Sequence, residues 1–213
     1  FGLSTDGDGD RVFFVDNKGE VINQAIIRGL LAKSFLTDKP GSKIGYDVRP
    51  GKITPDLILE NGGVPVVTRV GHSLIKEQMI KEEIYFAGES SGHFYFNSEI
   101  GCFEFPSLMI LKLLIAFSQS PLPVSEQVEQ YKRYFLSGEI NRTVSDKNKV
   151  FSAIEEKYGD GEINKLDGLT ITYPSFWFNV RASNTEPKVR LNLEAISPEI
   201  MAKKRDEILE LIK

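Results

Sequence analysis

The chain has 213 residues, a length that allows one large domain or two modest ones, each with its own hydrophobic core. Its apolar fraction of 41% and charged fraction of 26% are ordinary for a water-soluble protein, and a net charge of −4 argues against the basic surface that nucleic-acid binding needs. The most apolar run, 107–117, is too short to span a bilayer, and the single cysteine, Cys102, fits a reducing compartment, so we predict a cytoplasmic protein with no nucleic-acid or membrane partner.

The first 117 residues alternate between strand and helix patterns. The predicted elements are a strand at 12–15, a turn at 17–19 with a return strand at 20–22, helices at 25–36, 54–60, 73–81 and 106–117, strands at 43–48, 64–67 and 84–87, and a candidate edge strand at 93–96. Short strand–helix units in this order predict a parallel or mixed sheet covered by helices.

The pattern changes after a predicted linker at 118–123, SQSPLP. The elements predicted beyond it are helices at 125–134 and 149–158, strands at 139–144, 169–173, 176–180 and 189–193, and a final amphipathic helix that begins at 197–199. The alternation in 189–193 places Val189, Leu191 and Leu193 on one face of the strand. We therefore expect a mixed-sheet α/β domain followed by a small α+β domain.

The segment DGDGDR at 6–11 is the most distinctive feature of the chain. Its glycines let the backbone turn tightly, so that Asp6, Asp8 and Asp10 can converge, and three carboxylates beside Arg11 suit Mg²⁺ and a phosphate group. An ordinary surface turn and an aspartyl phosphatase stay open from this segment alone. An EF-hand fits poorly, because Arg11 and Asn17 stand where its loop needs Gly and Glu.

Two further segments contain both histidines. GESSGH at 88–93 follows an apolar strand, and open α/β sheets bind ligands beyond the carboxyl ends of their strands. Glu89, Ser91 and His93 could there hydrogen-bond sugar hydroxyls, although serine and glycine also occur in any loop. His72, in GHS at 71–73, lies at a helix N-terminus, where it could act as a neutral acid or base or simply cap the helix.

RASNTEP at 181–187 lies between two strands. Its polar side chains and backbone N–H groups make a candidate anion-binding nest, with a polar turn as the simpler alternative. The candidate residues are Arg181, Ser183, Asn184 and Thr185.

The four segments, in this order and spacing, resemble the α-D-phosphohexomutases, most closely the bacterial phosphomannomutase/phosphoglucomutase group. The resemblance covers the whole chain. It implies an intramolecular phosphotransferase that moves a phosphoryl group between O6 and O1 of a hexose phosphate, through an enzyme phosphoserine and a bisphosphorylated sugar. The implied partners are mannose or glucose 1- and 6-phosphates. One departure is GCFEFP at 101–106, where relatives often have an acidic pair.

The resemblance also assigns roles to individual residues. Asp6, Asp8 and Asp10 would hold Mg²⁺; Arg11 and His72 would serve catalysis; Glu89, Ser91 and His93 would bind the sugar; and Arg181, Ser183, Asn184 and Thr185 would bind the phosphate that does not react. The last domain is expected to have a TATA-box-binding-protein-like fold.

We also expect the chain to be the C-terminal part of a four-domain enzyme. The expected domains are 1–22, the end of domain 2 with the metal loop; 23–120, domain 3; and 121–213, domain 4. The family's phosphoserine segment does not occur in the sequence, so we expect no mutase turnover and weak Mg²⁺ binding without the N-terminal domains in cis. Phosphoglucosamine mutase is an alternative that Ala182 and Asn184 disfavour, and a non-catalytic sugar-phosphate-binding module is another.

Overall fold

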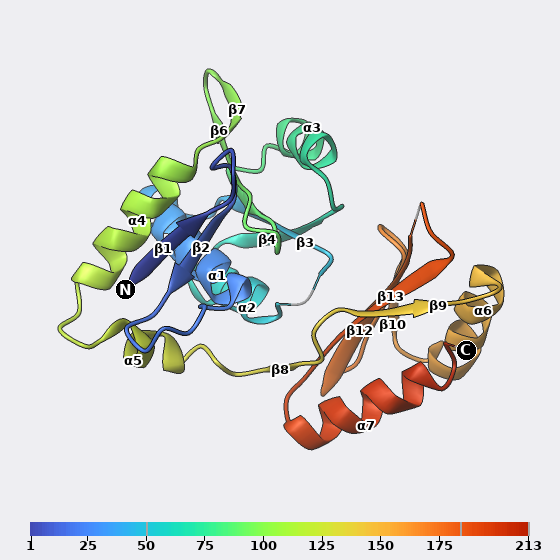
Figure 1. Cartoon of the computed structure of the whole chain (residues 1–213). Helices are drawn as coiled ribbons and strands as arrows, with labels where there is room; N and C mark the ends of the chain where they lie inside the picture. The colour runs from blue at the N-terminus through green and yellow to red at the C-terminus, as the bar shows by residue number, and fades with distance from the viewer. Residues whose placement is uncertain (50, 184, 213) are drawn as a thin grey trace. The chain divides into compact units, whose positions relative to one another are not determined.

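The computed structural model describes residues 1–49, 51–183 and 185–212, which form two compact units (Figure 1). Unit 1 is built from residues 1–47 and 51–132, and unit 2 from residues 133–212 with Val48 and Arg49. Each unit has its own sheet and its own hydrophobic core, so each is described by itself.

Unit 1 combines a five-stranded mixed sheet with a separate two-stranded hairpin. Its elements are β1 (Gly2–Thr5), β2 (Val12–Val15), α1 (Gln24–Asp38), β3 (Lys43–Asp47), α2 (Ile53–Glu60), β4 (Val64–Thr68), α3 (His72–Glu82), β5 (Phe86–Gly88), β6 (Phe94–Ser98), β7 (Gly101–Glu104), α4 (Pro106–Ser118) and α5 (Val124–Glu129). The strand order is β4-β3-β5-β6-β7, with β3 parallel to both of its neighbours and antiparallel pairing from β5 to β7. The predicted mixed sheet is therefore confirmed.

Helices cover both faces of this sheet. On one face, Phe35 of α1 stacks on Phe86 of β5 with ring centroids 4.5 Å apart. On the other face, Ile75 and Met79 of α3 pack in one buried cluster with Ala87 of β5. Successive residues of β5 thus point to opposite helices, as the period of a strand requires. This arrangement brings the segment that follows β5 to the sheet edge where α3 begins.

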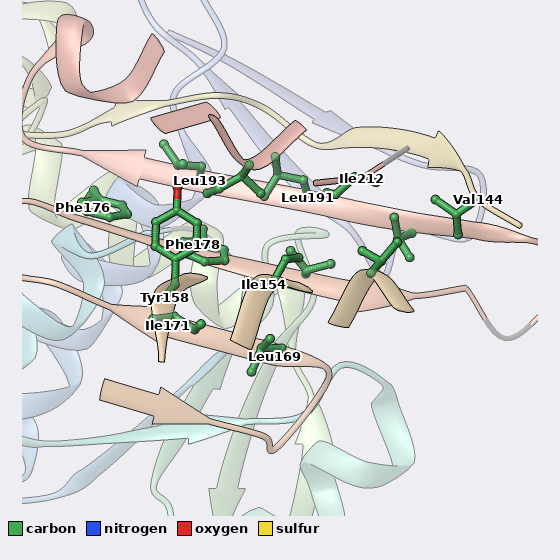
Figure 2. Packing of buried hydrophobic residues seen from close by; sticks show 14 of the residues in the cluster. Val144, Ile154, Tyr158, Leu169, Ile171, Phe176, Phe178, Leu191, Leu193 and Ile212 are labelled. Atoms are coloured by element: carbon green, nitrogen blue, oxygen red, sulfur yellow. The ribbon is translucent and has the colours of Figure 1, made fainter. Parts of the chain in front are cut away.

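Unit 2 is an antiparallel sheet with two helices. Its elements are β8 (Phe135–Leu136), β9 (Ile140–Thr143), α6 (Lys147–Tyr158), β10 (Glu162–Asn164), β11 (Leu169–Thr172), β12 (Phe176–Ala182), β13 (Lys188–Ala195) and α7 (Pro198–Leu209). The order is β10-β11-β12-β13-β8, and β9 also pairs with β13. Figure 2 shows the core, in which Phe178 and Leu191 pack with Ile154 of α6. The predicted α+β character is confirmed.

Two predicted elements are wrong in detail. The return strand at 20–22 is only an isolated bridge between Val15 and Val21, and β2 pairs with β1 instead, because the chain turns directly into α1. The helix predicted at 125–134 ends at Glu129, and Val128 is its last buried residue. The compact units separate after residue 132, whereas the predicted domain limits of 1–22, 23–120 and 121–213 stay a prediction.

Within the described ranges, no helix combines the length and the apolar character that crossing a membrane would need.

Candidate functional site

The acidic segment is the loop of the β1–β2 hairpin. Thr5 pairs with Val12, so residues 6–11 connect the two strands. Asp6, Asp8 and Asp10 each offer a carboxylate oxygen, and these oxygens lie within 4.8 Å of one another. A loop with such a cluster of hard oxygen donors fits Mg²⁺, which binds proteins through carboxylates and completes its shell with water or phosphate.

Arg11 supplies the positive charge nearest to these carboxylates in the hairpin. Its backbone N–H donates to Asp6 Oδ1 at 3.2 Å, and its Nε lies 3.4 Å from Asp6 Oδ2. Half of the Arg11 side chain is exposed, so the guanidinium can turn toward a bound anion. The assignment of the three carboxylates to a metal, and of Arg11 to catalysis, stays a prediction.

The second loop, residues 89–93, closes on itself after β5. The backbone N–H of Glu89 donates to the carbonyl of His93 at 2.9 Å, and that of Gly92 donates to the carbonyl of Glu89 at 3.1 Å. Glu89 is buried, and its Oε2 accepts a hydrogen bond from the Tyr95 hydroxyl at 3.0 Å. Burial, followed by the neighbouring Glu89 charge, raises the pKa of Tyr95, so this phenol stays a proton donor.

The acidic hairpin and the second loop are in direct contact. The backbone N–H of Val12 donates to the carbonyl of Gly92 at 3.0 Å. Nε2 of His93 lies 3.4 Å from Arg11 Nε and 3.3 Å from Asp10 Oδ1. The other ring nitrogen of His93, Nδ1, is 2.9 Å from the Ser91 hydroxyl. The structure therefore brings together two segments that are about eighty residues apart in sequence.

His72 belongs to the same cluster. It is the first residue of α3, and its ring centroid lies 4.3 Å from that of His93. Its Nδ1 is 2.6 Å from Glu104 Oε1, which also contacts Lys76 Nζ at 2.9 Å. The alternative that His72 merely caps the helix is wrong, because Gly71 is the N-cap and the imidazole is directed to a carboxylate instead.

A buried ion pair supports the second loop, and the sequence alone did not predict it. Arg28 of α1 and Asp47 at the end of β3 are almost fully buried and meet at 2.9 Å. Asp47 also accepts from the backbone N–H of Ser90 at 2.8 Å and from its hydroxyl at 2.9 Å. The sequence does contain a signal for Arg28, because it lies between Ile27 and Leu31 on the buried, apolar part of α1. An arginine in such a position needs a buried acidic partner.

The third predicted loop lies in unit 2, between β12 and β13. Arg181 Nη1 is 3.4 Å from Asp167 Oδ2, and the buried Ser183 accepts a hydrogen bond from the backbone N–H of Glu186 through its hydroxyl at 3.2 Å. Thr185 is exposed, and Asn184 lies outside the described residues.

A hollow of about 500 Å³ adjoins this loop. Its lining includes Lys147 and Asn148 from the start of α6 together with Thr185. Lys147 Nζ donates to the carbonyl of Ser183 at 2.5 Å. The hollow therefore has a cation that the sequence alone did not single out, because a lysine at a helix start beside a strand end gives only a weak signal.

Comparison with known proteins gives one consistent result. Residues 23–134 match the family model "Phosphoglucomutase/phosphomannomutase, alpha/beta/alpha domain III", and residues 139–211 match "Phosphoglucomutase/phosphomannomutase, C-terminal domain". The phosphomannomutase of Methanocaldococcus jannaschii is 44% identical over 211 residues, which cover 99% of this chain and 47% of that protein. The phosphomannomutase of Escherichia coli strain K12 is 37% identical over 199 residues, covering 91% of this chain and 43% of that protein.

Solved structures agree. A phosphoglucomutase/phosphomannomutase family protein from Burkholderia thailandensis superposes with a TM-score of 0.86 at 30% identity, over 100% of this chain and 46% of that one. An Aspergillus fumigatus N-acetylphosphoglucosamine mutase, solved in complex with GlcNAc-6P and magnesium, superposes with a TM-score of 0.69 at 15% identity, over 99% of this chain and 52% of that one. At this identity the likeness supports the fold alone. The chain spans about half the length of the curated relatives it matches.

Proposed function

Because the chain belongs to the phosphoglucomutase/phosphomannomutase family, we propose that it is the substrate-binding and metal-binding part of a phosphohexomutase. The reaction would interconvert hexose 6-phosphate and hexose 1-phosphate, with mannose phosphate as the proposed substrate. The observation that carries the proposal is the meeting of the acidic hairpin with the loop at 89–93, where carboxylates, an arginine and two imidazoles share one edge of unit 1.

The chemistry of the hairpin suits phosphoryl transfer, in which catalysis consists mainly of positioning and of neutralising charge. Asp6, Asp8 and Asp10 would hold Mg²⁺, which, when bound, supplies positive charge to the transferring phosphoryl group. Arg11 would add a second positive charge on the same side. Its guanidinium is half exposed, and its contacts to Asp6 Oδ2 and His93 Nε2 are long, at 3.4 Å each, so it is able to pair with a phosphate.

The loop at 89–93 would orient the sugar. A buried carboxylate held by Tyr95 is a rigid acceptor for hydroxyl groups, and rigid acceptors bind without a large loss of conformational entropy. Ser91 and His93 would add further hydrogen bonds. His72, beside His93 and partly exposed, would hold or move a proton at the edge of the site.

The loop of unit 2 would bind the phosphate that does not react. Arg181, Ser183, Asn184 and Thr185 are the residues assigned to it. Thr185 lines the hollow beside the loop, where Lys147 is a further cation. The partners are then a hexose phosphate and, in the whole protein, the domains that supply the phosphoserine. We place the protein in the cytoplasm, in accord with its single cysteine.

A calorimetric titration of the chain tests the proposal. We expect mannose 1-phosphate to bind more tightly than inorganic phosphate, and we expect Glu89→Gln to weaken mannose 1-phosphate about tenfold while leaving inorganic phosphate unchanged, because a hydrogen bond to a charged group contributes about 1.5–3 kcal/mol. Glu99→Gln, an exposed carboxylate on the β6–β7 turn, is the control. Equal failure of mannose 1-phosphate and glucosamine 1-phosphate to bind would contradict a preorganised sugar loop.

A further inference from the structure

Four potential metal ligands meet in unit 1, and only one of them belongs to the aspartate hairpin. Asp10 comes from the hairpin loop, His72 from the first turn of α3, His93 from the loop before β6, and Glu104 from the end of β7. One ligand atom from each residue lies within 4.8 Å of the ligand atoms of the other three. The cluster is thus assembled by four separate elements of one compact unit.

The four side chains already form two close pairs. His72 Nδ1 and Glu104 Oε1 are 2.6 Å apart, and His93 Nε2 and Asp10 Oδ1 are 3.3 Å apart. In a tetrahedral zinc site with bonds of about 2.1 Å, neighbouring ligand atoms are about 3.4 Å apart. The His93–Asp10 pair is already near this spacing, whereas the His72–Glu104 pair is a hydrogen-bonded contact that would have to open by about 0.8 Å to admit an ion. Small rotations of the partly exposed His72 and Asp10 side chains would bring the pairs together.

The donor atoms indicate which ions would bind. Two imidazole nitrogens and two carboxylate oxygens form a set that suits Zn²⁺ and Co²⁺, whereas Mg²⁺ prefers oxygen ligands in an octahedral shell. The aspartate hairpin offers carboxylates only, so the two clusters differ in their preferred metal although they share Asp10.

Glu104 gives a second, independent observation. Its Oε1 is engaged by His72 and Lys76, whereas its Oε2 is buried and has no hydrogen-bond partner within the part of the chain that the structure describes. Leaving a buried carboxylate oxygen without a partner is costly, and a bound ion is one way in which proteins satisfy such an atom. A cation bound through Glu104 Oε2, or through both of its carboxylate oxygens, would remove this cost.

Two side-chain cations border the cluster. Lys76 Nζ lies 2.9 Å from Glu104 Oε1, and Arg11 Nε lies 3.4 Å from His93 Nε2. Both side chains are at least one third exposed, so both can move into solvent when a metal binds. Their positive charges oppose metal binding, so removing the charge of Lys76 should raise the affinity of the site for a metal ion.

We propose that Asp10, His72, His93 and Glu104 form a binding site for a zinc-class divalent ion, distinct from the three-aspartate loop and linked to it through Asp10. The site depends on the geometry of unit 1 and not on the mutase activity. It would be present whichever sugar phosphate the protein uses.

Titration of the intact chain with Co²⁺, followed by visible absorption, tests the proposal. We expect the intense bands of four- or five-coordinate Co²⁺ at one equivalent. Both histidines of the sequence belong to the cluster, so nitrogen ligation of Co²⁺ would point to this site, and the variants below test the individual ligands. Pale octahedral Co²⁺ would overturn the proposal, and so would a thiolate charge-transfer band, which would assign the ion to Cys102.

Four variants make the test specific. His72→Gln and Glu104→Gln should each weaken Co²⁺ about tenfold or more, and Lys76→Gln should tighten it about fivefold through the loss of a nearby positive charge. Glu99→Gln, on the same β6–β7 hairpin as Glu104, should leave the affinity unchanged. His72 is partly exposed at a helix start, so its variant should fold, which circular dichroism would verify. Unchanged affinity in the folded His72→Gln chain would refute the site.

Discussion

Replacing Asp47 by Asn should destabilise unit 1 strongly. The change keeps the volume of the side chain but removes its charge, while Arg28 remains buried. Asp47 is the acceptor in the 2.9 Å contact with Arg28 and in two hydrogen bonds from Ser90, and an Asn amide would direct N–H groups at some of these donors. Breaking a buried pair by removing one partner costs about 3–5 kcal/mol.

The two units allow the effect to be localised. The single tryptophan, Trp177, lies in unit 2, so its fluorescence follows that unit, while far-ultraviolet circular dichroism follows both. In urea unfolding we expect Asp47→Asn to lower the circular dichroism transition of unit 1 and to leave the tryptophan transition in place. The expected loss corresponds to about 10–20 °C in Tm for a domain of this size.

A double-mutant cycle separates charge from shape. Arg28→Met removes the buried cation, so the double variant should recover part of the loss caused by Asp47→Asn. Asp38→Asn is the matched control, since it breaks an exposed contact with Lys112 and should cost less than about 1 kcal/mol. A loss for Asp47→Asn no larger than that of Asp38→Asn, or a double variant that shows the full sum of the two losses, would refute the reasoning.

Two further predictions concern unit 1. Gly92 has φ +93°, and a Cβ there would lie 3.2 Å from the Val12 carbonyl oxygen, so Gly92→Ala should lower the free energy of unfolding by about 1–3 kcal/mol in a denaturant titration. The loss should exceed that of the control Gly62→Ala, because Gly62 has φ +74° but open space around it. Equal losses would show that the contact with the hairpin is unimportant. Burial raises the pKa of Tyr46 to about 12, so the stability contributed by the neutral phenol is complete below about pH 10 and is lost as the pH rises toward 12. The wild-type chain should therefore lose more stability than Tyr46→Phe between pH 9 and pH 11.5. Equal losses in the two chains would contradict this prediction.

The sequence predicts best where one local pattern decides the structure. Period-2 alternation correctly assigns Val189, Leu191 and Leu193 to the buried face of β13, and the strand-then-polar-loop pattern correctly places residues 89–93 beyond the end of β5. The opposite face of β13 is less simple, because Glu194 is also buried and accepts a hydrogen bond from Trp177 Nε1 at 2.7 Å. Alternation identifies the faces of a strand but not what covers them.

The support of the site could not be predicted in the same way, because it depends on contacts between distant residues. Arg28 meets a carboxylate nineteen positions away and a loop hydroxyl sixty-two positions away, and no local pattern encodes either distance. Glu104 was hidden for another reason. Its strand, β7, was not predicted, so nothing indicated that the β6–β7 hairpin would return the carboxylate to His72.

His93 contacts both loops of unit 1 through its two ring nitrogens. Its Nε2 can accept a proton donated by Arg11 or donate one to Asp10, but a neutral imidazole cannot do both with one nitrogen. If Nε2 accepts from Arg11, Nδ1 carries the proton and donates to Ser91; Glu89 Oε2 lies 3.4 Å from the same Nδ1. If Nε2 instead donates to Asp10, Nδ1 must accept from the Ser91 hydroxyl. Two adjacent hairpin residues therefore compete for the tautomer of a histidine in the proposed sugar loop. The tautomer of His93 therefore decides whether the Ser91 hydroxyl donates or accepts.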